Sequence, residues 1–282
     1  MSSRRDFFKT SGAFALGSML LPELVKATAA GYPVKEVGVQ LYSVRKEMLE
    51  DNIGTLKKLA KLGYNQIESA GSEKGYYYGL KPAEIKKVIA DLGMKLRSGH
   101  VHYDENSWQK TIDDAAEAGQ EYLIVSSMPS KGQTADNYQK VAEAFNKAGE
   151  QSKKSNLKFG YHNHDYEFEK AGGKILYEVL VEKTDPAVVH MEMDLGWVVV
   201  TGNDPLDFFA RYPGRFPLWH LKDMDLVKKH SVEFGKGGLP IMKILNASKE
   251  AGMKYFFIEQ EEYASTAFES LEYDIDFLKK LV

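Results

Sequence analysis

Apolar and polar positions along this chain follow two alternating patterns from about residue 34 to the carboxyl end. Short apolar, β-prone runs alternate with longer stretches in which apolar residues recur at helical spacing. The short runs predict strands at residues 37–42, 64–69, 95–102 and 122–127, and four more that start at residues 157, 188, 216 and 254. The longer stretches predict a helix that ends at residue 62 and further helices at residues 82–93, 105–118, 135–155, 174–184, 205–212, 240–251 and 266–281.

Glycines mark the ends of several predicted helices. Gly63, Gly93 and Gly119 each follow the last periodic residue, where a glycine adopts the left-handed conformation that ends a helix. Strand followed by helix, eight times over, closes most simply as an α/β protein of the (β/α)₈ TIM-barrel type. A doubly wound open sheet is the alternative, but no Gly-x-Gly-x-x-Gly turn follows the first strand. No stretch resembles a linker, so residues 31–282 are expected to form a single domain.

The first 30 residues differ from the rest of the chain. A basic segment with Arg4 and Arg5 precedes an apolar run at residues 12–21 and small residues at 27–30. This layout resembles a twin-arginine export signal, which predicts that residues 1–30 are a signal peptide and that the mature protein is exported to the periplasm. A basic amphipathic helix kept on the mature protein is the alternative. The chain has no cysteine, so no disulfide would stabilise it there.

Length and charge limit the partners of this protein. Its 282 residues suffice for one large core, and its formal net charge is -3. An acidic protein binds nucleic acid and anionic lipid poorly, because both are themselves negatively charged. No segment after residue 30 is long and apolar enough to span a membrane. We therefore expect neither nucleic acid nor membrane as a partner of the mature protein.

The functional side chains of a TIM barrel gather at the carboxyl ends of its strands. The segment Tyr161-His162-Asn163-His164-Asp165 ends the fifth predicted strand, and alternate residues of a strand point the same way, so both histidines are expected to face one space. The other strand ends also offer polar side chains. These are Gln40 and Tyr42, Glu68, His100 and His102, Ser126, Asp194, His220 and Lys222, and Glu259 and Glu261.

Four of these positions form a candidate metal site. His162, Asp194, His220 and Glu259 come from the last four strand ends, and such nitrogen and oxygen donors without thiolate suit a divalent Mn, Co, Mg, Fe or Zn ion. Each residue also has a structural alternative. A histidine can be satisfied within the core, Asp194 can cap nearby amides, and Glu259 can pair with a neighbouring lysine. Their joint occurrence at successive strand ends favours a metal site.

A divalent ion bound by two substrate oxygens polarises a carbonyl group and makes the neighbouring C–H group more acidic. A base must then lie within reach of that proton, and Glu259 and His164 are the candidates. Lys222 shares a face with His220 and would hold a hydroxyl or stabilise an enolate; a solvated lysine is the alternative.

Substrate contacts are expected from the remaining strand-end side chains and from aromatic residues. Trp197 and Trp108 are the candidates for stacking on a sugar ring. The run Gly235-Lys236-Gly237-Gly238 lacks the spacing of a P-loop, so it predicts a lid or a turn, and Glu233 just before it would reach the substrate. The predicted substrate-binding residues are Gln40, Tyr42, Glu68, His100, His102, Trp197 and Glu233.

The order and spacing of these motifs resemble the xylose isomerase-like TIM-barrel superfamily, in particular its sugar phosphate isomerase/epimerase group, which includes tagatose epimerase-like enzymes and inosose dehydratase. The similarity covers nearly all of residues 34–282. The matching motifs are Gln40-Leu41-Tyr42-Ser43, Tyr161-His162-Asn163-His164-Asp165, Asp194-Leu195-Gly196-Trp197, His220-Leu221-Lys222-Asp223 and Ile258-Glu259-Gln260-Glu261.

The resemblance implies a metal held at the same four positions, which are Glu, Asp, His and Glu in the family. His162 departs from this pattern. It replaces one of the two carboxylates that act as acid and base in the epimerases, whereas the inosose dehydratase-like members also carry His-x-His on this strand. The family further implies homo-oligomers.

Three classes of function remain open from the sequence. The first is a metal-dependent sugar isomerase or epimerase that transfers a proton next to a carbonyl. The second is a lyase or dehydratase that eliminates water or a glycosidic group from a keto-sugar, keto-glycoside or keto-inositol. The third is a non-catalytic sugar-binding barrel. An apurinic endonuclease would need more metal ligands and a basic groove, which this acidic chain lacks. A small carbohydrate is the expected partner in all three classes.

Overall fold

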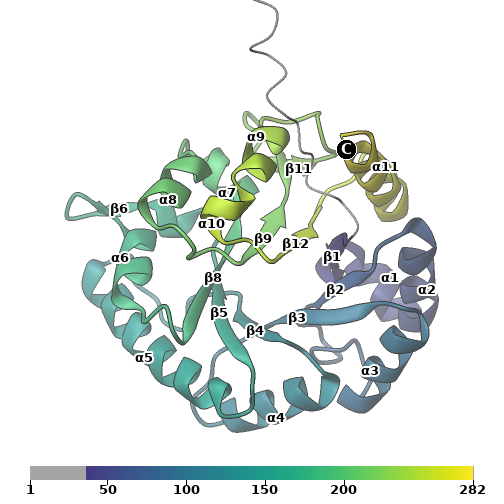
Figure 1. Cartoon of the computed structure of the whole chain (residues 1–282), viewed down its shortest axis with the longest axis horizontal. Helices are drawn as coiled ribbons and strands as arrows, with labels where there is room; N and C mark the ends of the chain where they lie inside the picture. Colours follow the sequence, from purple (N-terminus) through teal and green to yellow (C-terminus); the bar gives the residue numbers. More distant parts are fainter. Residues whose placement is uncertain (1–35, 282) are drawn as a thin grey trace, which may run out of the picture. The chain divides into compact units, whose positions relative to one another are not determined.

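The computed structural model describes residues 36–281, and these form a closed barrel of parallel strands (Figure 1). The strands follow the order β1-β12-β9-β8-β5-β4-β3-β2 around the barrel. The predicted TIM-barrel fold is therefore confirmed. The predicted export signal, residues 1–30, lies outside the described residues. The barrel strands are β1 (Gly38–Gln40), β2 (Gln66–Ser69), β3 (Lys95–Val101), β4 (Tyr122–Val125), β5 (Lys158–His162), β8 (Val189–Asp194), β9 (Leu218–Leu221) and β12 (Tyr255–Ile258).

Helices surround the strands on the outside (Figure 1). Within residues 36–281, none of them combines the length and the apolar character that a membrane crossing requires. The helices are α1 (Arg45–Glu50), α2 (Asn52–Leu62), α3 (Pro82–Asp91), α4 (Trp108–Ala118), α5 (Ala135–Lys153), α6 (Leu176–Lys183), α7 (Leu195–Val200), α8 (Pro205–Arg211), α9 (Ile241–Asn246), α10 (Ser248–Ala251) and α11 (Ala267–Lys280).

Short elements decorate the loops at the carboxyl ends of the strands. A 3-10 turn follows β1 and another follows β5, and two antiparallel hairpins follow β5 and β9. These elements are η1 (Leu41–Val44), η2 (Tyr166–Phe168), β6 (Lys170–Ala171) with β7 (Lys174–Ile175), and β10 (Asp223–Asp225) with β11 (His230–Val232).

Local sequence explains where the helices end. Gly63 and Gly119 end α2 and α4 with φ angles of 108° and 77°, the left-handed conformation that a side chain would strain. The first predicted helix is interrupted, because Asp51 leaves the helical conformation and its carboxylate accepts a hydrogen bond from the Gly54 amide as the N-cap of α2. The first predicted strand stops at Gln40, whose side chain caps η1 by accepting from the Tyr42 amide.

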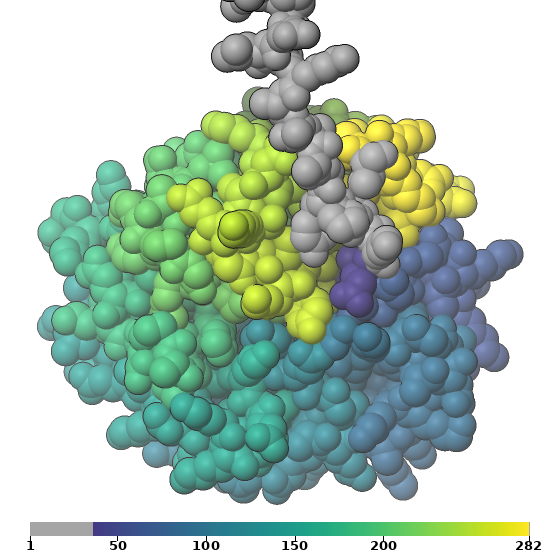
Figure 2. All heavy atoms as spheres, in the orientation of Figure 1, coloured from purple at the N-terminus to yellow at the C-terminus, as the bar shows by residue number. Residues whose placement is uncertain are grey.

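The barrel interior has an apolar part and a polar part. Tyr122, Ile124, Leu218 and Phe257 form a buried cluster contributed by three strands. Toward the carboxyl ends the inward side chains become polar, and strand register aligns them: Gln40 pairs with Glu68, and Asp194 pairs with His220. In the orientation of Figure 1, the described segments pack in chain order around the molecule (Figure 2). The apolar cluster supports the polar residues that form the candidate site.

Candidate active site

A cavity of about 240 Å³ opens at the carboxyl ends of the barrel strands. Such a volume suits a small ligand, since pockets for drug-sized molecules hold about 300–1,000 Å³. Many of the residues predicted at strand ends contribute to it, so the expected gathering of side chains takes place. Its lining comprises Tyr42, Ala70, Gly71, His100, His102, Ser126, His162, His164, Lys222, Glu259 and Glu261.

One side of the cavity is dominated by a buried lysine. The Nζ atom of Lys222 lies 2.9 Å from Oδ2 of Asp194, 2.7 Å from Oε2 of Glu259 and 2.7 Å from Oε1 of Glu261. Burial alone would lower the pKa of Lys222, but the three carboxylates raise it well above its usual value. The pKa of Glu259 moves the other way, because Lys222 and His220 outweigh the effect of burial. Lys222 is therefore a fixed positive charge at the cavity wall.

The structural alternatives considered for two predicted ligands both occur. Asp194 is the N-cap of α7, and its Oδ1 atom accepts a hydrogen bond from the Trp197 amide at 3.1 Å. Glu259 pairs with Lys222, as described above. Its Oε2 atom also lies 2.8 Å from Nδ1 of His220. Both carboxylates are therefore engaged by groups of this chain.

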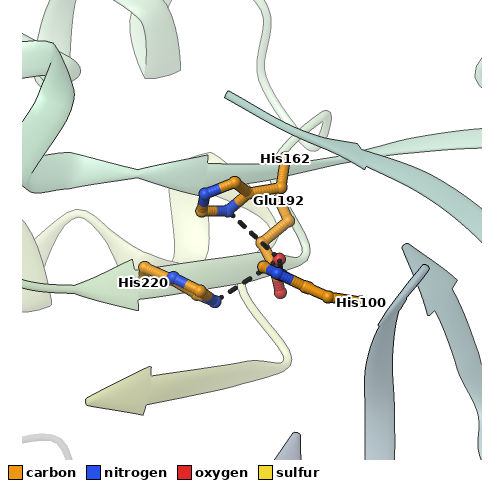
Figure 3. Close-up of side chains that lie close together, drawn as sticks. All are labelled: His100, His162, Glu192 and His220. Carbon is orange, nitrogen blue, oxygen red and sulfur yellow. Dashed lines mark hydrogen bonds and ion pairs between the residues drawn. The ribbon is translucent and has the colours of Figure 1, made fainter. Parts of the chain in front are cut away.

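A second group of side chains lies at and beneath the cavity floor: His100 and His162 line the cavity, and Glu192 and His220 do not. We call His100, His162, Glu192 and His220 the inner cluster (Figure 3). The three imidazole rings surround the carboxylate of Glu192, which comes from the middle of β8 and is fully buried. From its Oε2 atom to the nearest ring nitrogens the distances are 2.7 Å for His100, 3.3 Å for His162 and 3.5 Å for His220.

Glu68 completes this buried polar layer. Its Oε1 atom lies 2.6 Å from Nε2 of His220 and accepts a hydrogen bond from the Gln40 amide group at 2.8 Å. Burial would raise the pKa of Glu68, but His100 and His220 hold it well below its usual range. Burial and the charge of Glu68 raise the pKa of Glu192 to about 8. The layer thus combines one ionised carboxylate with one that titrates near neutral pH.

The histidines in this layer differ in charge. Burial alone would lower the pKa of His100, but Glu68 and Glu192 raise it to about 9. Burial and the neighbouring His220 hold the pKa of His162 well below its usual value, so its ring is neutral. The Nδ1 atom of His162 is buried and has no hydrogen-bond partner. A neutral ring with a free nitrogen is the form in which histidine binds a metal.

His164 stands beyond the end of β5 rather than on the strand. Its ring centroid lies 5.0 Å from that of His162, and it lines the cavity. Its amide donates a hydrogen bond of 2.9 Å to the buried carboxylate of Glu167, which also accepts from the Tyr161 hydroxyl. Burial and the charge of Lys222 lower the pKa of His164 to about 4. His164 is therefore a neutral imidazole at pH 7.

Several predicted substrate contacts lie elsewhere than expected. Gln40 and Glu68 are fully buried beneath the floor and do not line the cavity. Glu233 also lies outside the lining, where it accepts hydrogen bonds from Ser270 and from the Ala264 amide. Trp108 is a core residue that is 1% exposed. By contrast, Tyr42, His100 and His102 line the cavity.

Trp197 lies next to the cavity without being part of its lining. The Nζ atom of Lys222 lies 5.0 Å from the centroid of its ring, and the ring of His164 lies 6.4 Å away, centroid to centroid. Its indole Nε1 atom is buried without a hydrogen-bond partner. The ring of Trp197 thus contacts the charge of Lys222, and its role in stacking on a sugar stays a prediction.

Sequence reasoning missed Glu192 and Glu167. Glu192 stands two residues before Asp194, in the strand segment Met191-Glu192-Met193-Asp194. Acidic residues alternating with apolar ones within a buried strand place both carboxylates on one face, and this period of two was the available signal. Glu167 has no comparable signal, because its contact with Tyr161 depends on the fold of the loop after β5.

Two sets of side chains fit a metal ion. The inner cluster is one, and His162, Asp194, His220 and Glu259, which we call the outer set, is the other. In each set the candidate ligand atoms lie within 4.8 Å of one another. The unpartnered Nδ1 atom of His162 and Oε1 atom of Glu192 show unused donor capacity among buried groups. The residues present therefore suit a divalent ion.

Comparisons with known proteins agree with this fold. The family model described as xylose isomerase-like TIM barrel matches residues 56–281. Inosose dehydratase of Clostridium tetani is 27% identical over 161 residues, and the match spans 50% of this chain and about half, 53%, of that protein. Inosose dehydratase of Bacillus cereus is 25% identical over 258 residues, covering 77% of this chain and 84% of that protein.

A crystal structure of a sugar phosphate isomerase/epimerase from Parabacteroides distasonis is also similar. It is 30% identical to this chain, with a TM-score of 0.77, and the match covers 87% of this chain and 98% of the other.

Proposed function

Because the chain belongs to the family of xylose isomerase-like TIM barrels, we propose that it is a metal-dependent carbohydrate enzyme that removes a proton next to a carbonyl group. One observation carries this proposal. A neutral imidazole, His164, and a permanently charged ammonium group, Lys222, line the same cavity above a buried histidine and carboxylate layer. A neutral base beside a fixed cation is typical of a site that removes a proton and stabilises the anion that remains.

A divalent ion would be held by His162 and His220, which belong to both candidate sets. Asp194 and Glu259, as the sequence suggests, or His100 and Glu192 would complete its ligands. When bound, such an ion acts as a Lewis acid that polarises a carbonyl oxygen.

His164 is the residue best suited to accept the proton. A base must be unprotonated at the working pH, and the low pKa of His164 meets this condition. The hydrogen bond from its amide to Glu167 holds the loop after β5 in place, so the ring faces the cavity. Glu259 is a weaker candidate, because its Oε2 atom is already engaged by Lys222 and His220.

Lys222 would stabilise the negative charge that develops on the substrate as the proton leaves. Its ammonium group would also donate a hydrogen bond to a departing hydroxyl or glycosidic oxygen, which takes up the proton that His164 has accepted. One base beside a fixed cation favours elimination over epimerisation, which needs two groups that exchange roles on opposite faces of the substrate. We therefore propose elimination of water or of a glycosidic group from a keto-sugar, keto-glycoside or keto-inositol as the reaction.

Isomerisation or epimerisation is the second candidate. It is supported by the similarity to a protein described as a sugar phosphate isomerase/epimerase. A phosphorylated substrate fits this cavity less well than a neutral one, because Lys222 is the one lysine or arginine in the described lining and it already faces three carboxylates. Both candidates share the first step, loss of the proton next to the carbonyl.

The test is hydrogen exchange in heavy water. The full-length protein, loaded with Mn²⁺ or Co²⁺, is incubated with a 3-keto-glucoside, and the sugar is followed by mass spectrometry and NMR. Release of the aglycone with an unsaturated product supports elimination, whereas deuterium in a recovered sugar or epimer supports isomerisation. Neither exchange nor release with any divalent ion, together with tight binding of the sugar, would overturn the proposal in favour of a sugar-binding barrel.

A further inference from the structure

The inner cluster has the spacing of a set of metal ligands. Four donors placed tetrahedrally at about 2.0–2.1 Å from a zinc ion are separated from one another by about 3.3–3.4 Å. The Oε2 atom of Glu192 lies 2.7, 3.3 and 3.5 Å from ring nitrogens of His100, His162 and His220. The three distances from Glu192 therefore lie near the separation expected between ligands of one ion, and all four donors lie within 4.8 Å of one another. The side chains point toward one another from β3, β5, β8 and β9 (Figure 3).

Two atoms of the inner cluster lack partners although they are buried. His162 is 2% exposed, and its Nδ1 atom has no hydrogen-bond partner. The Oε1 atom of the fully buried Glu192 has none either. A buried polar atom without a partner costs free energy, so such atoms call for an explanation. A metal ion at the centre of the cluster supplies one for His162, because its free nitrogen is the atom that faces Oε2 of Glu192.

The outer set, by contrast, already contains a cation. The Nζ atom of Lys222 lies 2.9 Å from Asp194 Oδ2 and 2.7 Å from Glu259 Oε2, the two carboxylates that the outer set requires. A divalent ion bound there would face a like charge within a few ångströms in a buried site. Lys222 is only 1% exposed, so this like charge would be little screened by solvent.

The surroundings of the inner cluster also suit an ion. His220 can bind through Nε2 while its Nδ1–H donates to Glu259 at 2.8 Å, the hydrogen bond by which a metal-bound histidine is usually oriented. Glu68 adds a second carboxylate, 3.3 Å from Nε2 of His100. Two carboxylates in this layer match the charge of a divalent ion.

We propose that the resident divalent ion of this protein is held by His100, His162, Glu192 and His220, and that Lys222 takes the place of an ion in the outer set. This deepens the proposed function, on which it rests for the presence of a metal. The ion meets the cavity through His100 and His162, which form part of the cavity lining. Three imidazoles and one carboxylate favour zinc, cobalt or iron over magnesium. Asp194 and Glu259 remain free to hold Lys222 at the cavity wall.

Two isosteric substitutions separate the two sets. Glu192→Gln alters only the inner cluster, and Asp194→Asn alters only the outer set and preserves a side chain able to cap α7. The full-length wild type and both variants are stripped with a chelator, reloaded with Zn²⁺ and analysed for bound zinc and zinc affinity. We expect Glu192→Gln to lower zinc affinity at least tenfold and Asp194→Asn to change it less than threefold. Thermal unfolding of both variants checks that they are folded.

X-ray absorption at the zinc edge of the wild type gives a readout that needs no variant. Three imidazole ligands are expected for the inner cluster and two for the outer set. Three results would refute metal binding at the inner cluster: loss of zinc from Asp194→Asn alone, loss of zinc from both variants, or two imidazole ligands in the wild type. None of them would contradict the proposed function. If the zinc has three imidazole ligands but the protein exchanges no proton on any keto-sugar, the inner metal site is supported and the proposed function is refuted. A wild type that binds neither zinc nor any other divalent ion overturns both.

Discussion

The ammonium group of Lys222 lies 2.7 Å from Oε2 of Glu259, although the two side chains are only 1% and 6% exposed. A charge pair with so little solvent around it is costly to break, because the remaining partner is left buried and unpaired. The pair explains why the carboxylates at the ends of β8 and β12 need no metal to be neutralised. It also supplies the charge that stabilises a substrate anion in the cavity.

Lys222→Met should destabilise the metal-free protein. Asp194, Glu259 and Glu261 would lose their shared partner, and breaking a buried pair costs about 3–5 kcal/mol of unfolding free energy. Added Zn²⁺ should restore more stability to this variant than to the wild type, because the outer set then accepts an ion. Denaturant unfolding with and without zinc measures both effects.

Lys236→Met is the matched control for this substitution. Lys236 is 48% exposed and lies 3.2 Å from Glu233, so its loss should cost no more than about 1 kcal/mol. Equal stability of the Lys222 variant and the wild type would contradict the role given to the buried charge.

Glu167 should make stability depend on pH in a predictable direction. Burial raises its pKa to about 7, above the value near 4.5 that an exposed glutamate has. Between these values the folded protein keeps a proton that the unfolded chain has lost, so stability falls as pH rises from about 4.5 to about 7. The size of this effect is on the order of 3 kcal/mol. Glu167→Gln should remove it, which unfolding curves at several pH values would show. A constant difference between wild type and variant over this range would refute the assignment.

His164→Gln should slow proton exchange by about 10²–10⁴-fold, the usual contribution of a general base. Bound zinc should not change, because His164 belongs to neither candidate metal set. In the wild type, the low pKa of His164 keeps the base active down to about pH 4. The pH profile of kcat/KM for exchange in heavy water tests this. His230→Gln, outside the cavity lining, is the control, and an unchanged rate in His164→Gln would exclude this base.

Tyr42→Ala should raise KM without lowering kcat. Tyr42 is 38% exposed and lines the cavity, and the guanidinium of Arg45 lies 4.4 Å from its ring centroid, which holds the ring in place. An aromatic contact contributes about 0.5–1.5 kcal/mol, equivalent to about a 2- to 10-fold change in KM. Tyr42→Phe keeps the ring and should retain the wild-type KM. Steady-state kinetics on the keto-glucoside would decide, and a fall in kcat alone would speak against a binding role.

The location of the site followed from the sequence, because the carboxyl ends of parallel barrel strands meet at one face. His162, His220 and Glu259 were predicted to come together for this reason, and they do. The sequence did not predict how deeply each of these side chains would be buried. Gln40 ends β1 and Tyr42 follows two residues later, yet Gln40 is buried beneath the floor and Tyr42 lines the cavity. The turn into η1 produces this difference, and distant residues hold that turn: the Tyr78 hydroxyl donates to the Leu41 carbonyl and the Gln260 amide donates to the Ser43 hydroxyl.

The sequence by itself determined the alternation of strands and helices, the glycines that end helices and the strand ends that carry polar side chains, because periodicity and turn chemistry act between near neighbours. Only the tertiary structure decided that Glu192 lies among three histidines, that Lys222 faces three carboxylates and that His220 bonds to Glu68, 152 residues away. These pairings depend on the register and closure of the barrel. A strand's own residues specify which face a side chain takes, but the neighbouring strands specify what it meets there.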